Sequence, residues 1–443
     1  MPALARRLAI LALGSALPLV AQRAPLRYAT LRSAPFPSAL TAASQADRIA
    51  WAVNDRGKRN IVVAEGPAFT PRVLTPYDSD DGQELTSVQL SPRGDVVVYV
   101  RGGDFSSNFD DALPVNPLGM PTPTRVQIWS VPFAGGAPKA LGEGENPVIS
   151  PAGDAVVFER DRQLWRVPLD GSANAERLFT ARGDNGSAVF SPDGSRIAFV
   201  SNRGDHAFIG VYTNATTPIT WIAPSTNRDG SPRWSPDGTR LVFTRRPGAG
   251  GAPQPVLEQR HQPWALHTAT VATGEARELW RAPTTLRGSP PSTEGGVNLD
   301  WAAKGRIVFL SYVDGWPHLY SIAESGGEPL LLTPGPGMAE YITLTPDRTA
   351  LLFCGNMGST PGDIDRRHVV RVPVDRAAPE VVTPGTGLEW TPVQTGAGTL
   401  AYIAATAQRP PLVAVRTPST RAPLLLGERD LASYPTDALV VPQ

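Results

Sequence analysis

The chain has 443 residues, of which 41% are hydrophobic, and its 41 basic and 41 acidic residues give a formal net charge of zero. A chain without net charge has no global field that would attract nucleic acid or an anionic membrane, so we expect neither as a partner. The 42 glycines and 46 prolines follow no collagen-like period and alternate with hydrophobic runs, which indicates many turns between short strands rather than disorder.

Residues 1–21 are predicted to be a signal peptide. Arg6 and Arg7 precede an uncharged apolar stretch from Leu8 to Ala21, whose small final residues suit a signal peptidase. A membrane anchor is the alternative, but about 14 apolar residues are fewer than the roughly 20 that a helix needs to cross a bilayer. We therefore expect an exported protein, periplasmic or extracellular, with no membrane span after signal cleavage.

A short phrase, Ser-Pro-Asp-Gly, recurs along the remaining chain. It occurs at Ser191–Gly194 and at Ser235–Gly238, each time before a run of β-branched and aromatic residues. Proline presets φ for the second position of a tight turn, aspartate caps the turn, and glycine takes the positive φ that other residues resist. The phrase therefore predicts a hairpin turn that leads into a buried strand.

The phrase belongs to a longer repeat. Looser copies begin near Gln45, Ser91, Ser150, Ala302, Thr345 and Thr395. A second strand such as Gln163–Val167 follows in each unit, and then a glycine turn with a leucine-bearing strand such as Gly326–Leu332. About eight units of this kind, at intervals of roughly 40 to 60 residues, predict four-stranded antiparallel sheets.

Such sheets cannot bury both faces alone, whereas radial stacking closes them into a ring with only short edges. We predict an all-β fold, a β-propeller of four-stranded antiparallel blades over residues 22–430. The repeat count predicts eight blades, with seven as the alternative. Insertions at 102–123, 247–255 and 283–296 are expected to project as loops.

Several longer phrases go beyond a generic repeat. Leu74–Tyr77, Tyr99–Asp104 and above all Ser201–Tyr212, with its Arg-Gly-Asp-His sequence, resemble the N-terminal β-propeller of the prolyl oligopeptidase (S9) serine peptidases. The resemblance is to bacterial dipeptidyl-peptidase IV-like and acylaminoacyl-peptidase-like members and extends over nearly all of residues 22–443. The Ser-Pro-Asp-Gly phrases are shared more distantly with TolB-like WD40/PD40 propellers.

In that family an α/β-hydrolase domain with a Ser, Asp and His triad follows the propeller. Residues 431–443 are similar to the connector into that domain, so the resemblance implies a truncated connector and a missing hydrolase domain. The Gly-x-Ser-x-Gly elbow that presents the nucleophile is absent from the sequence, and Gly355–Gly362 has the wrong spacing. We therefore assign no catalytic residue to this chain.

The resulting hypothesis is a non-catalytic exported propeller that gates or docks peptide for a hydrolase. It would be a serine peptidase only if it were joined to a hydrolase domain. The alternative is a TolB-like propeller that binds a protein partner in the cell envelope, and a third possibility is a remnant without activity. The resemblance also implies paired glutamates that hold a substrate's amine, but Glu143, Glu145 and Glu258 do not match that pattern.

Charged residues that follow inner hydrophobic strands are the candidate site for a substrate or partner. They are Arg101, Asp104, Arg203, Asp205 and His206. One hypothesis is a charged channel rim that steers peptide termini. The other is structural, with Asp and Arg linking neighbouring blades and His206 bonding a backbone carbonyl.

No metal and no cofactor are predicted. The five histidines are scattered without the spacing of a zinc helix. Asp78, Asp80 and Asp81 lack the spacing of a calcium loop. Cys354 is the only cysteine and lies in an apolar run, so we expect a buried structural thiol.

Overall fold

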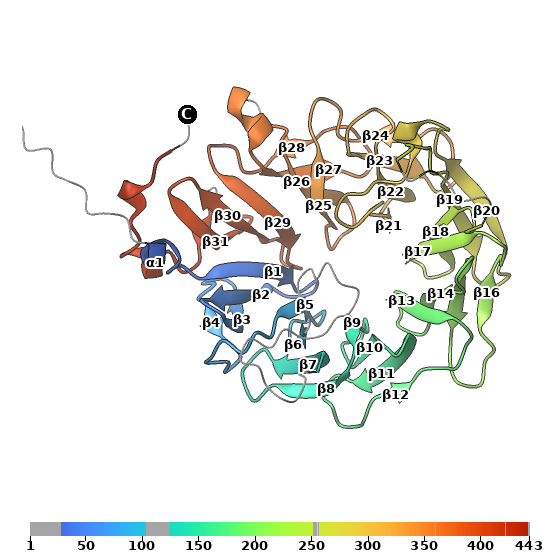
Figure 1. Cartoon of the computed structure of the whole chain (residues 1–443), viewed down its shortest axis with the longest axis horizontal. Helices are drawn as coiled ribbons and strands as arrows, with labels where there is room; N and C mark the ends of the chain where they lie inside the picture. Colours follow the sequence, from blue (N-terminus) through green and yellow to red (C-terminus); the bar gives the residue numbers. More distant parts are fainter. Residues whose placement is uncertain are drawn as a thin grey trace, which may run out of the picture.

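The computed structural model describes residues 28–102, 125–250, 255, 257–358, 360–420 and 422–441. Within these residues the chain is almost entirely β-structure, arranged as a ring of sheets around a central channel (Figure 1). The predicted signal peptide, Asp104 and all but the first residue of the insertion predicted at 102–123 lie outside the described residues. None of the described helices has the length and apolar character that a membrane span requires.

Eight four-stranded units make up the ring, each with its strands in sequence order from the channel outward (Figure 1). Blades 1 to 4 contain β1 (Phe36–Ala42), β2 (Arg48–Asp55), β3 (Lys58–Glu65), β4 (Arg72–Val73); β5 (Leu85–Leu90), β6 (Val96–Arg101), β7 (Gln127–Pro132), β8 (Lys139–Glu143); β9 (Glu145–Ile149), β10 (Ala155–Arg160), β11 (Gln163–Pro168), β12 (Glu176–Arg177); β13 (Asp184–Phe190), β14 (Ile197–Asn202), β15 (Ala207–Tyr212) and β16 (Thr220–Ile222).

Blades 5 to 8 contain β17 (Arg228–Trp234), β18 (Arg240–Arg246), β19 (Ala265–Thr270), β20 (Ala276–Arg281); β21 (Asp300–Trp301), β22 (Arg306–Ser311), β23 (His318–Ala323), β24 (Leu330–Leu331); β25 (Ala339–Leu344), β26 (Ala350–Gly355), β27 (His368–Pro373), β28 (Glu380–Val381); β29 (Leu388–Gln394), β30 (Leu400–Thr406), β31 (Arg409–Arg416) and β32 (Leu424–Leu425). The short helices are α1 (Tyr28–Leu31), η1 (Leu286–Gly288), η2 (Pro361–Asp365), η3 (Glu428–Leu431) and η4 (Thr436–Ala438).

The predicted fold class is confirmed, including the count of eight blades among the described residues. The strands within each blade pair antiparallel. A single parallel pairing, Ala207 opposite Arg228, links blades 4 and 5 into one continuous sheet.

The Ser-Pro-Asp-Gly phrase forms the predicted turn between the first and second strands of a blade. In blade 4 the Ser191 hydroxyl donates to Asp193 at 2.5 Å and accepts from the Arg196 amide at 3.0 Å. Gly194 has a φ of 73°. Hydrogen bonds from Ser191 and Ser195 lower the pKa of Asp193 to about 2. Local turn chemistry therefore starts each second strand where the sequence predicts it.

Every second strand carries one buried aromatic side chain that packs between blades. These residues are Trp51, Tyr99, Phe158, Phe199, Phe243, Phe309, Phe353 and Tyr402, each no more than 4% exposed. A large apolar ring at the same point of each unit joins successive sheets through a common set of contacts. Cys354 is buried as predicted, and burial raises the pKa of its thiol to about 12.

In blade 5 the aromatic ring stacks on a histidine. Phe243 and His267 have ring centroids 5.7 Å apart. His267 is only 9% exposed, and its Nδ1 has no hydrogen-bond partner among the described residues. Burial first, and then the charge of Arg245, lowers the pKa of His267 to about 4. The folded protein therefore holds this imidazole neutral.

We expect stability to fall when the medium is acidified from pH 7 to pH 5. Between a folded pKa of about 4 and an unfolded value of about 6.5, the unfolded chain binds the extra proton, so stability is lost as the pH falls through this window. The loss should be about 1–2 kcal/mol after allowance for solvent screening. Urea unfolding at both pH values measures it, and His267→Gln should remove most of the difference. An unchanged pH dependence in that variant would contradict the assignment.

The ring closes by direct contact between blades 1 and 8. Each of these blades is built from its own four consecutive strands. The Thr395 hydroxyl donates to Asp47 at 2.7 Å, and the Gly396 amide donates to the Ala43 carbonyl at 2.9 Å. Closure therefore depends on contacts between residues about 350 positions apart rather than on a strand shared between the two ends of the chain.

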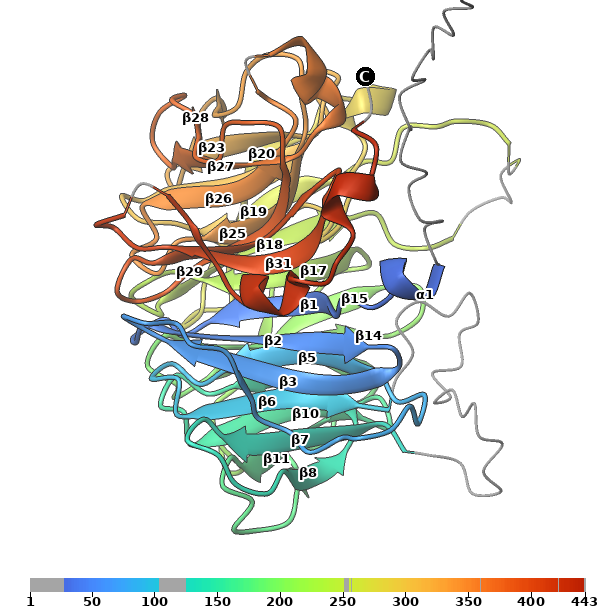
Figure 2. The ribbon, with the colours of Figure 1, turned by 90° about the vertical axis from the view of Figure 1, so that its left-hand side faces the viewer.

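Both described ends of the chain lie on one face of the propeller, together with the hairpin loops that join the second and third strands (Figure 2). Gln408 in one such loop donates from its side chain to the Leu439 carbonyl at 3.1 Å. The Tyr434 hydroxyl lies 3.5 Å from the Leu31 carbonyl. We call this the loop face.

Candidate functional site

The predicted rim residues of blade 4 lie in the β14–β15 turn on the loop face. The Asp205 carboxylate accepts a hydrogen bond from the Nδ1 atom of His206, at 2.6 Å. The Arg203 guanidinium lies over the rings of Phe208 and Trp221, 5.2 Å from each centroid. The expected carbonyl partner of His206 is thus replaced by a carboxylate, and Arg203 is held within its own blade rather than against a neighbour.

Arg101 ends β6 in blade 2 and is not brought into contact with the blade 4 residues. It pairs with Asp81 and lies over the Tyr77 ring, 4.3 Å from the centroid. Asp80 likewise pairs with Arg59 at 3.2 Å. Asp80 and Asp81, two of the three aspartates in the segment that superficially resembles a calcium loop, are therefore each paired with an arginine. In the described part of the chain, no group of three or more His, Cys, Asp or Glu residues is arranged to hold a metal ion.

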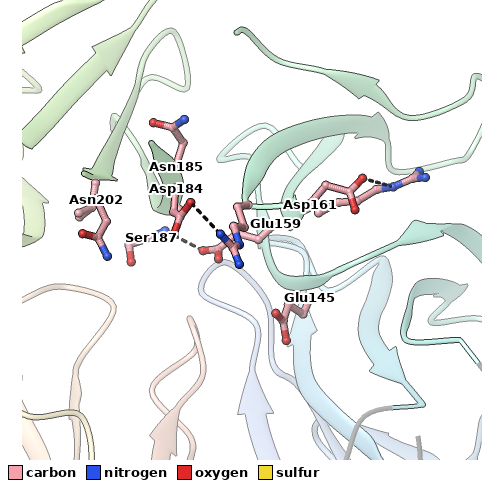
Figure 3. A pocket seen from close by; sticks show the side chains of 11 residues that line it. Glu145, Glu159, Asp161, Asp184, Asn185, Ser187 and Asn202 are labelled. Atoms are coloured by element: carbon pink, nitrogen blue, oxygen red, sulfur yellow. Dashed lines mark hydrogen bonds and ion pairs between the residues drawn. The ribbon is translucent and has the colours of Figure 1, made fainter. Parts of the chain in front are cut away.

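A cavity of about 320 Å³ opens on the loop face between blades 3 and 4 (Figure 3). We call it the acidic cavity. Its lining comes from the starts of the channel strands β9 and β13, the end of β10, the β10–β11 turn and the end of β14. The lining residues are Glu145, Glu159, Arg160, Asp161, Arg162, Asp184, Asn185, Gly186, Ser187, Val200 and Asn202.

A bulge in β13 shapes the floor of this cavity. The pairing of β13 with β14 shifts register between Gly186 and Val189, and Ser187 adopts a φ of 53°. The freed Ser187 amide donates to the Glu159 carboxylate of blade 3 at 2.7 Å. A Cβ atom on Gly186 would lie 2.7 Å from that carboxyl carbon, so a larger residue here would have to displace the Glu159 carboxylate.

Every channel strand has an equivalent left-handed residue, in or just before the strand. The set is Ala39, Ser87, Asn146, Ser187, Ser231, Asn298, Tyr341 and Thr391. Such a bulge interrupts pairing with the second strand and redirects side chains. The bulge therefore recurs around the channel, and its hydrogen bond to Glu159 is particular to the acidic cavity.

The charge balance of the acidic cavity is negative. Four carboxylates face two guanidinium groups, and the ion pairs between them are loose: Arg162 lies 3.8 Å from Asp184, and Arg160 lies 3.4 Å from Asp161. The exposed side chain of Glu145 has neither a hydrogen bond nor an ion pair with any described residue. The cavity thus presents at least one uncompensated carboxylate.

Asn185, which also lines the cavity, contains a buried acceptor without a partner, and its side chain points away from Glu145 (Figure 3). Asn185 is 1% exposed, and its amide nitrogen donates to Gln163, Ala181 and Gly183 at 3.0–3.2 Å. Its carbonyl oxygen is buried and has no partner among the described residues. A buried acceptor without a partner carries a free-energy cost that a hydrogen-bond donor would relieve. The excess of carboxylates, rather than this buried oxygen, is what suits the cavity to a cationic group that donates hydrogen bonds.

From the sequence, Glu145 was weighed only together with Glu143 as a possible pair of amine-binding glutamates. Glu159 and Asp184 were not predicted as site residues. Glu143 ends β8 and pairs with Arg125 instead. A signal for Glu159 was present, because it lies at the end of the second strand of blade 3 and Asp161 and Arg162 follow that strand, much as Arg203 to His206 follow the second strand of blade 4. That Asp184 of blade 4 lines the same cavity could not be predicted without knowing how blades 3 and 4 meet.

No protein-family model matches the sequence, and no curated protein matches it. Among solved structures, dipeptidyl peptidase 4 of Porphyromonas gingivalis is 14% identical with a TM-score of 0.61, over 89% of this chain and 60% of that one. A puromycin-hydrolyzing peptidase of Mycobacterium tuberculosis is 17% identical with a TM-score of 0.53, over 82% of this chain and 56% of that one.

This chain therefore spans less than two thirds of the length of either peptidase. A putative TolB from Agrobacterium tumefaciens is 19% identical over 58% of this chain, and its TM-score of 0.33 is too low to carry an argument. At such low sequence identities the comparisons show a similar fold and no more. The predicted resemblance to the propellers of S9-type peptidases is confirmed at that level, over most of the chain.

Proposed function

We propose that this chain is an exported, non-catalytic propeller that binds peptides on its loop face and presents them to a hydrolase. The main observation behind the proposal is the excess of carboxylates in the acidic cavity, where the Glu145 side chain has no partner among the described residues. A protonated amine, such as a peptide amino terminus or a lysine side chain, supplies both the positive charge and the hydrogen-bond donors that these carboxylates lack.

The peptide assignment is supported by the fold shared with the two peptidases. The absence of a Gly-x-Ser-x-Gly elbow from the sequence supports a binding role rather than bond cleavage. In addition, no serine hydroxyl of the described residues is hydrogen-bonded to a histidine, as a triad nucleophile would be. Export is supported by the apolar segment after Arg7. A TolB-like protein-binding role remains the alternative that the sequence left open.

The test is binding of short peptides to the purified chain, measured by calorimetry with free and N-acetylated amino termini. We expect the free amine to bind at least about tenfold more tightly, because a charge-assisted hydrogen bond is worth about 1.5–3 kcal/mol. Glu145→Gln should abolish this preference. Glu380→Gln, on the exposed outer strand β28, is the matched control and should leave the preference intact.

A peptidase assay and a serine-directed fluorophosphonate label are run on the same preparation. No turnover and no labelled serine are expected. Equal binding of free and acetylated peptides would refute amine recognition at the acidic cavity. Turnover with a labelled serine would refute the non-catalytic assignment.

A further inference from the structure

A second cavity, of about 720 Å³, lies on the loop face at blade 5. It is formed by the start of β17, the end of β18 and parts of two proline-rich insertions. The lining residues are Arg228, Asp229, Gly230, Ser231, Thr244, Arg246, Pro247, Gly248, Ala249, Gln262, Pro263, Pro290, Pro291 and Ser292. We call it the basic cavity.

Two arginines in this cavity lie directly opposite each other. Arg228 of β17 is the cross-strand partner of Arg246 of β18, so both side chains project from the same face of the sheet. Among the described residues neither has an ion-pair or hydrogen-bond partner. Like charges in this arrangement repel and destabilise the sheet. Burial, and after it the charge of Arg228, lowers the pKa of Arg246.

The one carboxylate among the lining residues is already paired. Asp229 pairs with Arg245, whose two guanidinium nitrogens donate at 2.6 and 2.7 Å. Because side chains alternate along a strand, this pair and the two cavity arginines project from opposite faces of the sheet. The cavity therefore holds two positive charges that the described residues do not compensate.

The cavity walls indicate what kind of anion fits. Four prolines, Pro247, Pro263, Pro290 and Pro291, form rigid apolar surfaces beside the two guanidinium groups. A guanidinium binds a carboxylate through two parallel hydrogen bonds, and an apolar wall packs against the carbon chain that carries it. A carboxylate attached to an amino acid residue matches both features.

The basic cavity adjoins the predicted rim residues. The Ala249 amide, in its wall, donates to the Asp205 carbonyl at 2.7 Å. Asn202, at the other end of the same β14–β15 turn, lines the acidic cavity (Figure 3). The turn that contains Arg203 and His206 thus separates a negative from a positive cavity on one face.

From this arrangement we infer that the basic cavity is a carboxylate subsite, formed by Arg228 and Arg246, for the carboxy terminus or an acidic side chain of a bound peptide. The inference rests on the proposed peptide-binding function and extends it to a second recognition element. It assigns the substrate class as peptides that carry a free carboxylate.

The test uses N-acetylated peptides, which lack the amine recognised by the acidic cavity, with either a free or an amidated carboxy terminus. We expect the free acid to bind the wild-type chain at least about tenfold more tightly than the amide, and this preference to weaken with added salt. Arg228→Gln and Arg246→Gln should each abolish the preference. Arg376→Gln, at an exposed surface site, should retain it.

Each arginine variant is also unfolded in urea. Because the two charges repel, the midpoint should be unchanged or raised, which a structural role of either arginine would not produce. Equal binding of acid and amide by the wild-type chain, or a preference that persists in Arg246→Gln, would overturn the inference. Competition by inorganic phosphate but not by free-acid peptides would assign the cavity to phosphate and overturn it as well.

Failure here is distinguishable from failure of the proposed function. Amine recognition is read from free against acetylated amino termini and from Glu145→Gln, whereas carboxylate recognition is read from acetylated peptides alone. A chain that discriminates the amine but not the carboxylate would keep the proposed function and lose the subsite.

Discussion

Replacement of Arg245 by methionine is expected to lower the free energy of unfolding by about 3–5 kcal/mol at pH 7. Arg245 holds Asp229 through two short hydrogen bonds, and the Asp229 side chain is fully buried. Removal of one partner leaves a buried carboxylate without its counter-charge, which costs far more than loss of a surface pair. Urea unfolding of the variant measures the loss.

The loss in the free energy of unfolding caused by Arg245→Met should be smaller at pH 5 than at pH 7. Burial raises the pKa of Asp229, while Arg245 acts to lower it, so the variant should have a higher pKa still. Between the unfolded value of about 3.8 and that raised value, the folded variant binds a proton that the unfolded chain lacks. Its stability therefore declines as the pH rises through this window. A deficit that grows on acidification would contradict this account.

Two controls separate the buried charge from the loss of side-chain packing. The double variant Asp229→Asn with Arg245→Met removes both charges and should recover a large part of the stability. Arg93→Met breaks the exposed pair of Arg93 and Asp95 and should cost no more than about 1 kcal/mol. If the double variant is as unstable as Arg245→Met, packing rather than charge is responsible.

Phe309→Ala is expected to cost about 3–5 kcal/mol. Phe309 of blade 6 is fully buried and packs against Trp264 and Trp280 of blade 5, with ring centroids 6.2 and 4.9 Å away. Tyr320 of its own blade lies 5.8 Å away on a neighbouring strand. Truncation leaves a cavity between two blades that the rigid sheets can fill only partly.

The measurement is the shift in the urea unfolding midpoint, with amide hydrogen exchange of β19 and β22 as a local readout. Exchange should accelerate on both sides of the interface. Leu424→Ala is the matched control, because this leucine is 50% exposed on an outer strand and its truncation should cost less than about 0.5 kcal/mol. Similar losses in the two variants would refute a joining role for the aromatic ring.

The repeat could be predicted from the sequence because its causes are local. The Ser191 to Gly194 turn is formed by hydrogen bonds within a few residues and by a glycine with positive φ. The aromatic residue of the second strand follows each turn at a nearly constant spacing, as Phe199 and Phe243 do. Local turn chemistry and strand alternation thus predicted the fold and the eight blades.

The acidic cavity could not be predicted in the same way. Glu145 and Glu159 belong to blade 3, whereas Asp184 and Ser187 belong to blade 4, and they meet only because the blades stack. The β13 bulge that turns the Ser187 amide toward Glu159 has no glycine at the left-handed position to mark it. Of the predicted rim, Arg203 directly follows Asn202, which lines this cavity, while Arg101 lies in blade 2.

The sequence by itself determined the all-β class, the four-stranded unit, the number of units and the turns that begin each second strand, because these depend on contacts within one repeat. Only the tertiary structure decided how the ring closes at Thr395 and Asp47, and which charges share a cavity. The β17–β18 register, with its shift between Gly230 and Arg233, places Arg228 opposite Arg246. A slip of one residue would have turned these side chains to the other face of the sheet, so pairing register and blade stacking fixed the site.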